Sequence, residues 1–329
     1  MSNIENTRIC VQQILPIHQA EIQNIRQHPQ HNKLQAAFWA KKLWPTNSKI
    51  RIAFLDSGEN ITKTNIQVLK NAGGNYSGPI DPLQNIVPSY TVQEMIKKVV
   101  NERIKPLVNL DIEFVNHPKD ANVRISFDPD GGAWSLVGTD ALHQKTGATM
   151  NLGWFDVPTC IHEFGHMLGM IHEHQNPRGQ KIEWDDNEVF KWAETTQGWS
   201  KNTTEKNIID KYDISSINGS VFDPLSVMLY FFPAKLTLNH KGTHQNLRLS
   251  GLDVQWISKM YPKTGGESPN QFYERVYDES IQDSIHKSIL DRDSFVNDNN
   301  NYTVYWIIAI SIIVILILVV LWLLLSKNL

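Results

Sequence analysis

The chain has 329 residues, of which 41% are hydrophobic and 20% charged, and its formal net charge is −3. These values are ordinary for a globular protein and allow one large domain or two smaller ones. Because the chain is slightly acidic and has no Lys/Arg block, we exclude a nucleic-acid reader. Its two cysteines, Cys10 and Cys160, are too few for a disulfide framework, and we expect two separate reduced thiols.

Residues 1–40 are polar and rich in Gln, His and Asn, and we interpret them as a leader or pro-like segment. They lack the basic start, apolar core and cleavage site of a secretory signal peptide. From Lys49 the pattern changes, because KIRIAFLD alternates as a strand does. A glycine- and proline-rich loop, GGNYSGPIDP, follows it.

The stretch TVQEMIKKVVNERIKPLV predicts an amphipathic helix, because its apolar residues recur with the helical period. Thr91 is the expected N-cap, and Glu94 three residues later completes a capping box. The expected core residues of this helix are Val92, Met95, Ile96, Val99, Val100 and Ile104.

Three later stretches, DIEFVN, ANVRISF and ATMNLGW, predict short strands. The loop DPDGGAWS begins like a calcium loop, but it lacks the required Asp/Asn–Gly order and the closing glutamate, so a calcium site is rejected. Strands, one long helix and then a histidine-rich helix predict an α+β domain over residues 41–263.

The stretch CIHEFGHMLGMIHEHQNP, residues 160–177, holds four of the twelve histidines. His162 and His166 are four residues apart, so a helix presents both imidazoles on one face, with Cβ atoms about 6 Å apart. Glu163, beside the first histidine, is placed to hold a water on the same metal ion, as in the H-E-x-x-H arrangement. His174 falls outside this spacing, and we expect it behind the ligands or on the surface.

The ends of this helix are also marked. Asp156 or Thr159 is the expected N-cap, and Pro158 is tolerated in the first turn. Gly169 is expected to end the helix in the left-handed region, so that the chain returns with His172 as a third ligand. Three neutral imidazoles and one open position are the arrangement of catalytic zinc, which we prefer over copper or iron.

The full spacing H-E-x-x-H-x-x-G-x-x-H has a chance frequency on the order of a few in 10⁵ for such a chain. This motif over residues 162–172 resembles that of the metzincin zinc peptidases. The stretch DPLSVMLYFF resembles the Met-turn of the astacin branch at Ser226, Met228 and Tyr230, and Glu173 matches that branch too. The resemblance implies a metzincin-like fold, with a twisted mixed sheet, long helices, an active-site helix and a Met-turn.

The resemblance also implies site residues. One Zn²⁺ per chain is held by His162, His166 and His172, Met228 forms a hydrophobic floor below it, and Tyr230 is a movable fifth ligand that helps to hold the oxyanion. The stretch NVRISFDPDGGAWSLVGTDA resembles the edge strand and loop that bind an extended substrate. The expected strand residues are Val123, Arg124, Ile125, Ser126 and Phe127.

The likeness has limits, because both ends of the chain fall outside it. The two disulfides of secreted astacins cannot form with two cysteines, and the aspartate-type pro-segment switch is not recognisable. Cys10 could cap the zinc from a pro-segment, although its surroundings lack the usual cysteine-switch pattern.

We expect a zinc metalloendopeptidase that acts on proteins or peptides. Glu163 takes a proton from a zinc-activated water and passes it to the leaving amine, while zinc and Tyr230 stabilise the oxyanion. The alternative is a catalytically inactive, metal-stabilised adhesion or envelope protein on a membrane. The intact Glu163 counts against that alternative, since a structural metal site has no use for a base.

The C-terminal part changes character twice. Residues 264–303 are polar with scattered apolar positions and predict a stalk, partly helical. Residues 304–325 carry no charge and are long enough to cross a hydrocarbon layer of ~30 Å. Tyr305 and Trp306 mark one end and Trp322 the other, so we predict a transmembrane helix. Residues 326–329 form a short tail.

The sequence does not decide on which side of the membrane the folded domain lies. The positive-inside rule, applied to Lys327, places the tail in the cytosol, whereas the missing signal peptide favours a domain in the cytosol. One lysine is too little to decide, and the N-x-S/T sequons do not decide it either. A virion or organelle envelope is one setting for such an anchor, and the oligomeric state is unknown.

Overall fold

The structure is a computed structural model that describes residues 38–65, 69, 79–177, 182–212, 217–218 and 222–277. The chain divides into two compact units, Met1–Tyr277 and Asp278–Leu329. The predicted leader up to residue 37, the predicted stalk beyond Tyr277, the predicted transmembrane helix and the tail lie outside the described residues. Within the described part of the chain, no helix is long and apolar enough to cross a membrane.

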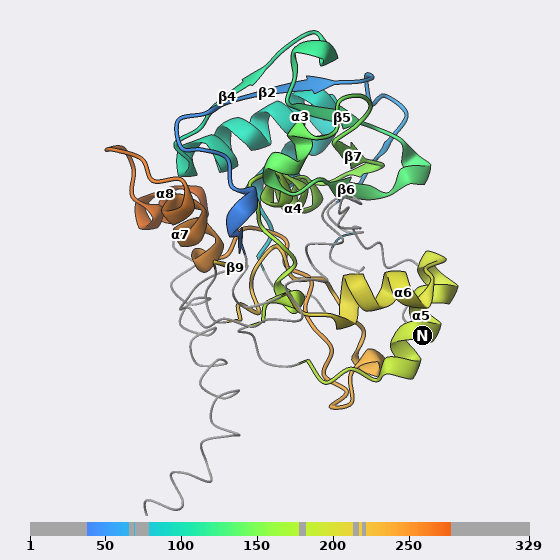
Figure 1. The fold of residues 1–329 in the computed structure, drawn as a ribbon. Coiled ribbons are helices and arrows are strands. Elements are labelled where there is room, and N and C mark those ends of the chain that lie inside the picture. The colour runs from blue at the N-terminus through green and yellow to red at the C-terminus, as the bar shows by residue number, and fades with distance from the viewer. Residues whose placement is uncertain are drawn as a thin grey trace, which may run out of the picture. The chain divides into compact units, whose positions relative to one another are not determined.

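Figure 1 shows the elements of the first unit. The strands are β1 (Phe38–Trp39), β2 (Lys49–Phe54), β3 (Thr62–Lys63), β4 (Asp111–Phe114), β5 (Val123–Ser126), β6 (Ala133–Ser135), β7 (Met150–Leu152), β8 (Trp154–Phe155) and β9 (Ile217–Asn218). The helices are α3 (Val92–Val99), α4 (Val157–Met167), α5 (Asp186–Gln197), α6 (Lys201–Thr204), α7 (Gly251–Met260) and α8 (Pro269–Tyr277).

The main sheet has the strand order β4-β2-β5-β7-β6, in which only β6 runs antiparallel to its neighbour. In β2, Ile50 and Ile52 are fully buried, whereas Lys49 and Arg51 are exposed and pair with Glu113 of β4. The predicted alternation of KIRIAFLD is therefore real, and the mixed sheet with helices confirms the expected α+β class.

The predicted substrate-binding edge strand is wrong. Strand β5, which contains most of Val123–Phe127, lies between β2 and β7 and is hydrogen-bonded to both. Its backbone donors and acceptors are thus already used and are not free to pair with a substrate. Alternation predicts a strand but not its neighbours. The two edges of the sheet are β4 and the antiparallel β6, Ala133–Ser135.

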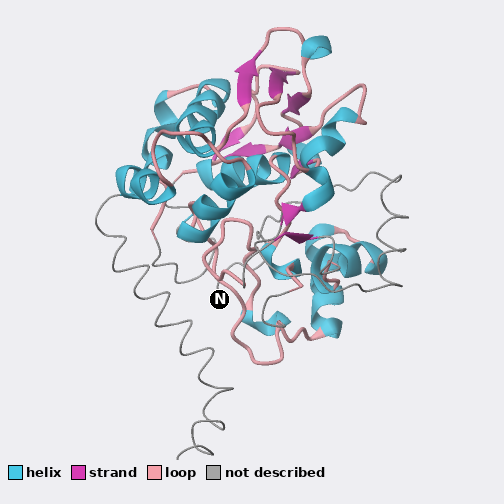
Figure 2. Cartoon of the chain, turned by 60° about the vertical axis from the view of Figure 1, so that its left-hand side comes forward, coloured by secondary structure: helices cyan, strands magenta, loops and turns pink. Residues whose placement is uncertain are grey.

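Helices α3 and α4 lie side by side against the same face of this sheet (Figures 1 and 2). Helix α3 begins as predicted, because Thr91 and Glu94 form a reciprocal capping box. It continues as a π-helical turn over Val100–Ile104, and all six predicted core residues are buried. Helix α3 and strand β6 both contact α4, which carries the histidine motif.

Both ends of the predicted peptidase domain extend further than its predicted boundaries suggest. Phe38 and Trp39, in the predicted leader, are buried, and β1 pairs with β9. Helix α8 lies in the predicted stalk and packs against α7. Its Tyr277 is buried and donates a hydrogen bond to Asp81 Oδ2 at 3.2 Å.

Candidate active site

Helix α4 begins and ends where the sequence predicts. The Asp156 carboxylate accepts a hydrogen bond from the Thr159 N–H at 2.7 Å, so Asp156 is the N-cap, and Pro158 lies in the first turn. At the other end Gly169 has φ +97°, a conformation that favours glycine. The helix is therefore followed at once by a reversal that brings His172 back towards it.

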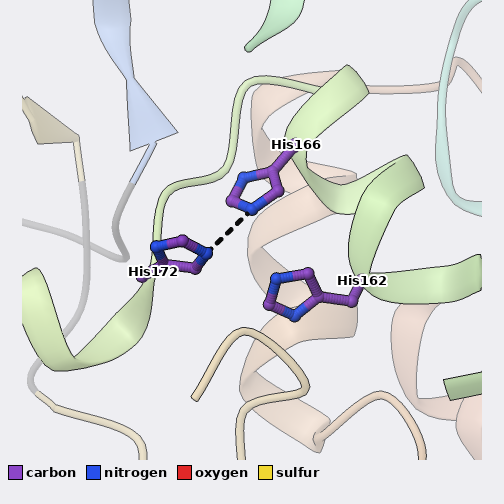
Figure 3. Close-up of side chains that lie close together, drawn as sticks. All are labelled: His162, His166 and His172. Carbon is purple, nitrogen blue, oxygen red and sulfur yellow. Dashed lines mark hydrogen bonds between the residues drawn. The ribbon is translucent and has the colours of Figure 1, made fainter. Parts of the chain in front are cut away.

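The three predicted histidine ligands converge. One potential ligand atom from each of His162, His166 and His172 lies within 4.8 Å of the other two, and all three residues are buried. His166 Nε2 and His172 Nε2 are 3.0 Å apart, and Figure 3 marks this contact with a dashed line. Ligands at zinc–nitrogen distances in a tetrahedral site lie about 3.3 Å from each other, so the spacing is close to that of a metal site.

Backbone carbonyl groups orient the two helical histidines. His162 Nδ1 lies 2.9 Å from the carbonyl oxygen of Val227, and His166 Nδ1 lies 2.8 Å from that of Met170. Because a carbonyl oxygen only accepts, each Nδ1 carries the proton, and each Nε2 presents a lone pair. This is the tautomer that a metal ligand needs when its other nitrogen is held by a backbone group.

The buried nitrogens fit a zinc ion. His162 Nε2 is shielded from solvent and has no hydrogen-bond partner among the described residues. Burial lowers the pKa of His162 to about 4, and burial also lowers the pKa values of His166 and His172 well below their usual range. The imidazoles are therefore neutral at neutral pH, and a cation satisfies the lone pair that the protein leaves without a donor.

Two further predicted site residues lie beside this cluster. Glu163 follows His162 on α4 and is fully buried. The Tyr230 hydroxyl lies 2.5 Å from His172 Nε2, and its ring centre is 4.2 Å from that of His172 and 5.6 Å from that of His162. The structure thus brings a hydroxyl group to the edge of the three nitrogens.

Met228 packs beneath the histidine helix. It is fully buried, and a methyl group placed on Gly165 would lie 2.6 Å from its Sδ atom. Gly165, between the two helical histidines, therefore has no side chain because Met228 fills that space. Met228 thus packs against α4, and its role as a hydrophobic floor below the metal stays a prediction.

The Met-turn is held from behind by Asp253 of α7, which sequence reasoning missed. Asp253 accepts hydrogen bonds from the Ser226 hydroxyl at 2.7 Å and from the Val227 N–H at 2.9 Å. The pattern Ser250-x-x-Asp253 before an apolar run is a capping-box signature that could have predicted the start of α7. No local signal could have predicted the contact with Ser226, because 27 residues separate the two.

Glu173, which follows the third histidine, is a buried anchor as well. Its Oε1 accepts hydrogen bonds from the Asp223 N–H and from the Asn176 side chain, both at 2.9 Å. Burial, with a further contribution from the Asp223 charge, raises the pKa of Glu173 well above its usual range. The side chain thus joins the loop after His172 to the segment that leads into the Met-turn.

His174 is not on the surface, which was one of its two expected positions. It is 2% exposed, and its Nε2 lies 2.8 Å from the carbonyl oxygen of Asn207. Its ring centre is 5.3 Å from that of His172 and 5.0 Å from that of Phe232. His174 is absent from the metal-binding group found among the described residues and lies behind it.

This chain is similar to known peptidases. The family model "Astacin", which describes a family of peptidases, matches residues 89–262, which is more than half of the chain. A structure of myroilysin is 29% identical, with a TM-score of 0.56, and covers 70% of this chain and 100% of its own. A crystal structure of myroilysin is 27% identical, with a TM-score of 0.48 and coverages of 80% and 94%.

High choriolytic enzyme 1, a hatching-enzyme zinc protease from the medaka fish Oryzias latipes, is 14% identical, with a TM-score of 0.38. Its alignment covers 70% of this chain and 100% of that enzyme. A search of curated protein sequences found no significant match. The family model and the buried histidine cluster agree on the same chemistry, and the chain therefore belongs to the astacin family of peptidases and is a zinc metalloendopeptidase.

Proposed function

We propose that this chain hydrolyses peptide bonds with Glu163 as its general base, at a zinc ion held by His162, His166 and His172. The observation that carries the proposal is the buried, unpartnered His162 Nε2 in a cluster of three converging imidazoles. A structural zinc site has four protein ligands, whereas three ligands leave a position open for chemistry. Glu163 beside the first ligand is the group that such chemistry requires.

Zinc, when bound, polarises the scissile carbonyl group and makes a water molecule more acidic. The Glu163 carboxylate takes a proton from that water and later passes it to the nitrogen of the leaving amine. The Tyr230 hydroxyl donates a hydrogen bond to the oxyanion as the carbonyl carbon becomes tetrahedral. Its place 2.5 Å from His172 Nε2 supports this role, because it puts the hydroxyl beside the three histidines.

The substrate is an extended segment of a protein or peptide. Strand β6 is hydrogen-bonded only to β7 among the described strands, so its other side is available for an added strand. β6 contacts helix α4, and Ala133 packs in the same apolar cluster as Tyr230. A peptide paired with β6 would therefore run close to the histidines.

The residues 304–325 anchor this peptidase to a membrane. The support is their length and their lack of charge, which suit a transmembrane helix. Cell fractionation of the whole chain and of a chain without 304–325 tests the anchor: we expect the first in the membrane pellet and the second in the supernatant. Equal distribution of the two would rule the anchor out. If the whole chain is found in the membrane pellet, protease protection locates the domain on one side of the membrane.

Glu163→Gln tests the catalytic proposal. The amide cannot take a proton, so we expect hydrolysis of a denatured protein mixture to fall by about 10²- to 10⁴-fold. Zinc content should remain one per chain, and Glu59→Gln, an exposed change, should leave both quantities unchanged. A Glu163→Gln variant with near-normal, chelator-sensitive activity would end the proposal. A wild-type chain that binds zinc without any activity would favour the inactive adhesion or envelope protein.

A further inference from the structure

Asp253 connects the core of the protein to the Met-turn. Its Oδ1 accepts a hydrogen bond from the Ser226 hydroxyl at 2.7 Å, and its Oδ2 accepts one from the Val227 N–H at 2.9 Å. Asp253 is 4% exposed, so solvent does not compete for these bonds. The two bonds thus hold two consecutive residues of the Met-turn from one side chain.

Asp253 also has an ordinary structural role. It completes a capping box with Ser250 at the start of α7, because Oδ2 accepts the Ser250 N–H at 3.0 Å and the Ser250 hydroxyl accepts the Asp253 N–H at 2.9 Å. Glu94 occupies the same third position in the capping box of α3, where its partner is Thr91 and no contact with the Met-turn is formed. The two caps share their geometry, but Glu94 is exposed whereas Asp253 is buried and also holds the Met-turn.

Val227 of the Met-turn connects Asp253 to the metal centre. The Val227 carbonyl oxygen lies 2.9 Å from His162 Nδ1, so the N–H of Val227 meets Asp253 while its C=O meets His162. His166 has a local partner, the carbonyl of Met170 four residues on, whereas 65 residues separate His162 from Val227. His162 is therefore the helical histidine whose ring orientation depends on a tertiary contact.

We propose that Asp253 is a positioning residue of the metal centre: by holding Ser226 and Val227, it fixes the carbonyl oxygen that orients the His162 ring. The inference rests on the proposed function, in which His162 is a zinc ligand. Groups that orient a ligating imidazole typically contribute about 10- to 100-fold to metal affinity or activity. Asp253 acts at one remove, through the Val227 backbone, and touches neither substrate nor metal.

The test compares zinc affinity, measured by chelator competition, in the full chain and four variants. We expect Asp253→Ala to weaken zinc binding by about 10- to 100-fold. Asp253→Asn should lose less, because its amide oxygen can accept from the Val227 N–H while its amide nitrogen donates to the Ser226 oxygen. Glu94→Ala removes the equivalent helix cap and should leave zinc affinity unchanged. The fourth variant, Ser226→Ala, removes one of the two bonds between Asp253 and the Met-turn.

A second readout separates positioning from simple stabilisation. The absorption bands of Co²⁺ bound in place of zinc report ligand geometry, and we expect them to shift in Asp253→Ala but not in Glu94→Ala. Wild-type zinc affinity and an unshifted spectrum in Asp253→Ala would overturn the inference. If Asp253→Ala does not fold, Ser226→Ala decides in its place, and wild-type affinity there would overturn the inference equally. If the wild-type chain binds no zinc, the proposed function falls first.

Discussion

The metal centre has two sides that are built in different ways. On one side, His162 and His166 stand four residues apart on α4, and the helix alone places their rings together. On the other side, His172, Met228 and Tyr230 stand on irregular segments that are held by hydrogen bonds between distant residues, such as Val227 with Asp253. The helical period alone thus places the side chains of the first side, whereas those of the second side are placed by tertiary contacts with the rest of the fold.

The largest expected effect on the irregular side lies at Tyr230. Loss of one oxyanion donor typically lowers kcat by about 10²- to 10³-fold, so Tyr230→Phe should lose that much activity while it keeps its zinc. Steady-state kinetics and metal analysis check this, with the exposed Tyr90→Phe as the control. Normal kcat in Tyr230→Phe would mean that the Tyr230 hydroxyl does not stabilise the oxyanion and that the irregular side has only a structural role.

Acid should destabilise both sides together when the metal is removed. Burial lowers the pKa of His162 from 6.5 to about 4, so between these pH values the unfolded chain takes up a proton that the folded chain refuses. The free energy of unfolding is therefore highest above pH ~6.5 and decreases as the pH falls towards ~4. This histidine alone accounts for a decrease on the order of a few kcal/mol.

Urea unfolding of the zinc-free chain over a pH series measures this loss. His166 and His172 shift in the same direction and should add to it. A free energy of unfolding that stays constant across the interval would show that the histidines are accessible to protons in the folded state, and that the cluster is less buried than described.

Contact between the two sides is tested by Gly165→Ala. Alanine favours a helix over glycine by ~1 kcal/mol, but its methyl group would meet Met228 Sδ at 2.6 Å. Overpacking costs about 1 to 3 kcal/mol, so we expect a net loss of stability in thermal unfolding. A more stable Gly165→Ala variant would show that the Met228 side chain moves to accommodate the added methyl group and that the packing beneath α4 is adaptable.

The smallest effects separate two helix ends. Gly169 (φ +97°) and Gly198 (φ +66°) both have positive φ, and each alanine variant should lose about 1 to 2 kcal/mol of stability. Gly169→Ala should also weaken zinc binding, because the chain reversal at Gly169 brings His172 to the site. Gly198 ends α5, which carries no zinc ligand, so Gly198→Ala should leave zinc binding unchanged. Equal zinc affinity in both variants would show that the reversal is set by other contacts.

Much of the helical side could be predicted because its signals are local. The capping box at Thr91, the cap at Asp156 and the end at Gly169 each depend on residues within a few positions of one another. The same holds for the spacing of His162 and His166, since helical geometry repeats without reference to the rest of the chain. Position along the chain was enough to find these features.

Order within the sheet and support of the Met-turn could not be predicted. Alternation predicts that Val123–Ser126 form a strand, but only the folded sheet places β2 and β7 on its two sides and leaves the edges to β4 and β6. The pattern of Ser250 and Asp253 could have predicted the start of α7, but only tertiary packing brings Asp253 to Ser226 and Val227. The physical reason is that periods and caps act over a few residues, whereas strand neighbours and buried polar partners are chosen by the whole chain as it minimises exposed apolar surface and unpaired polar groups.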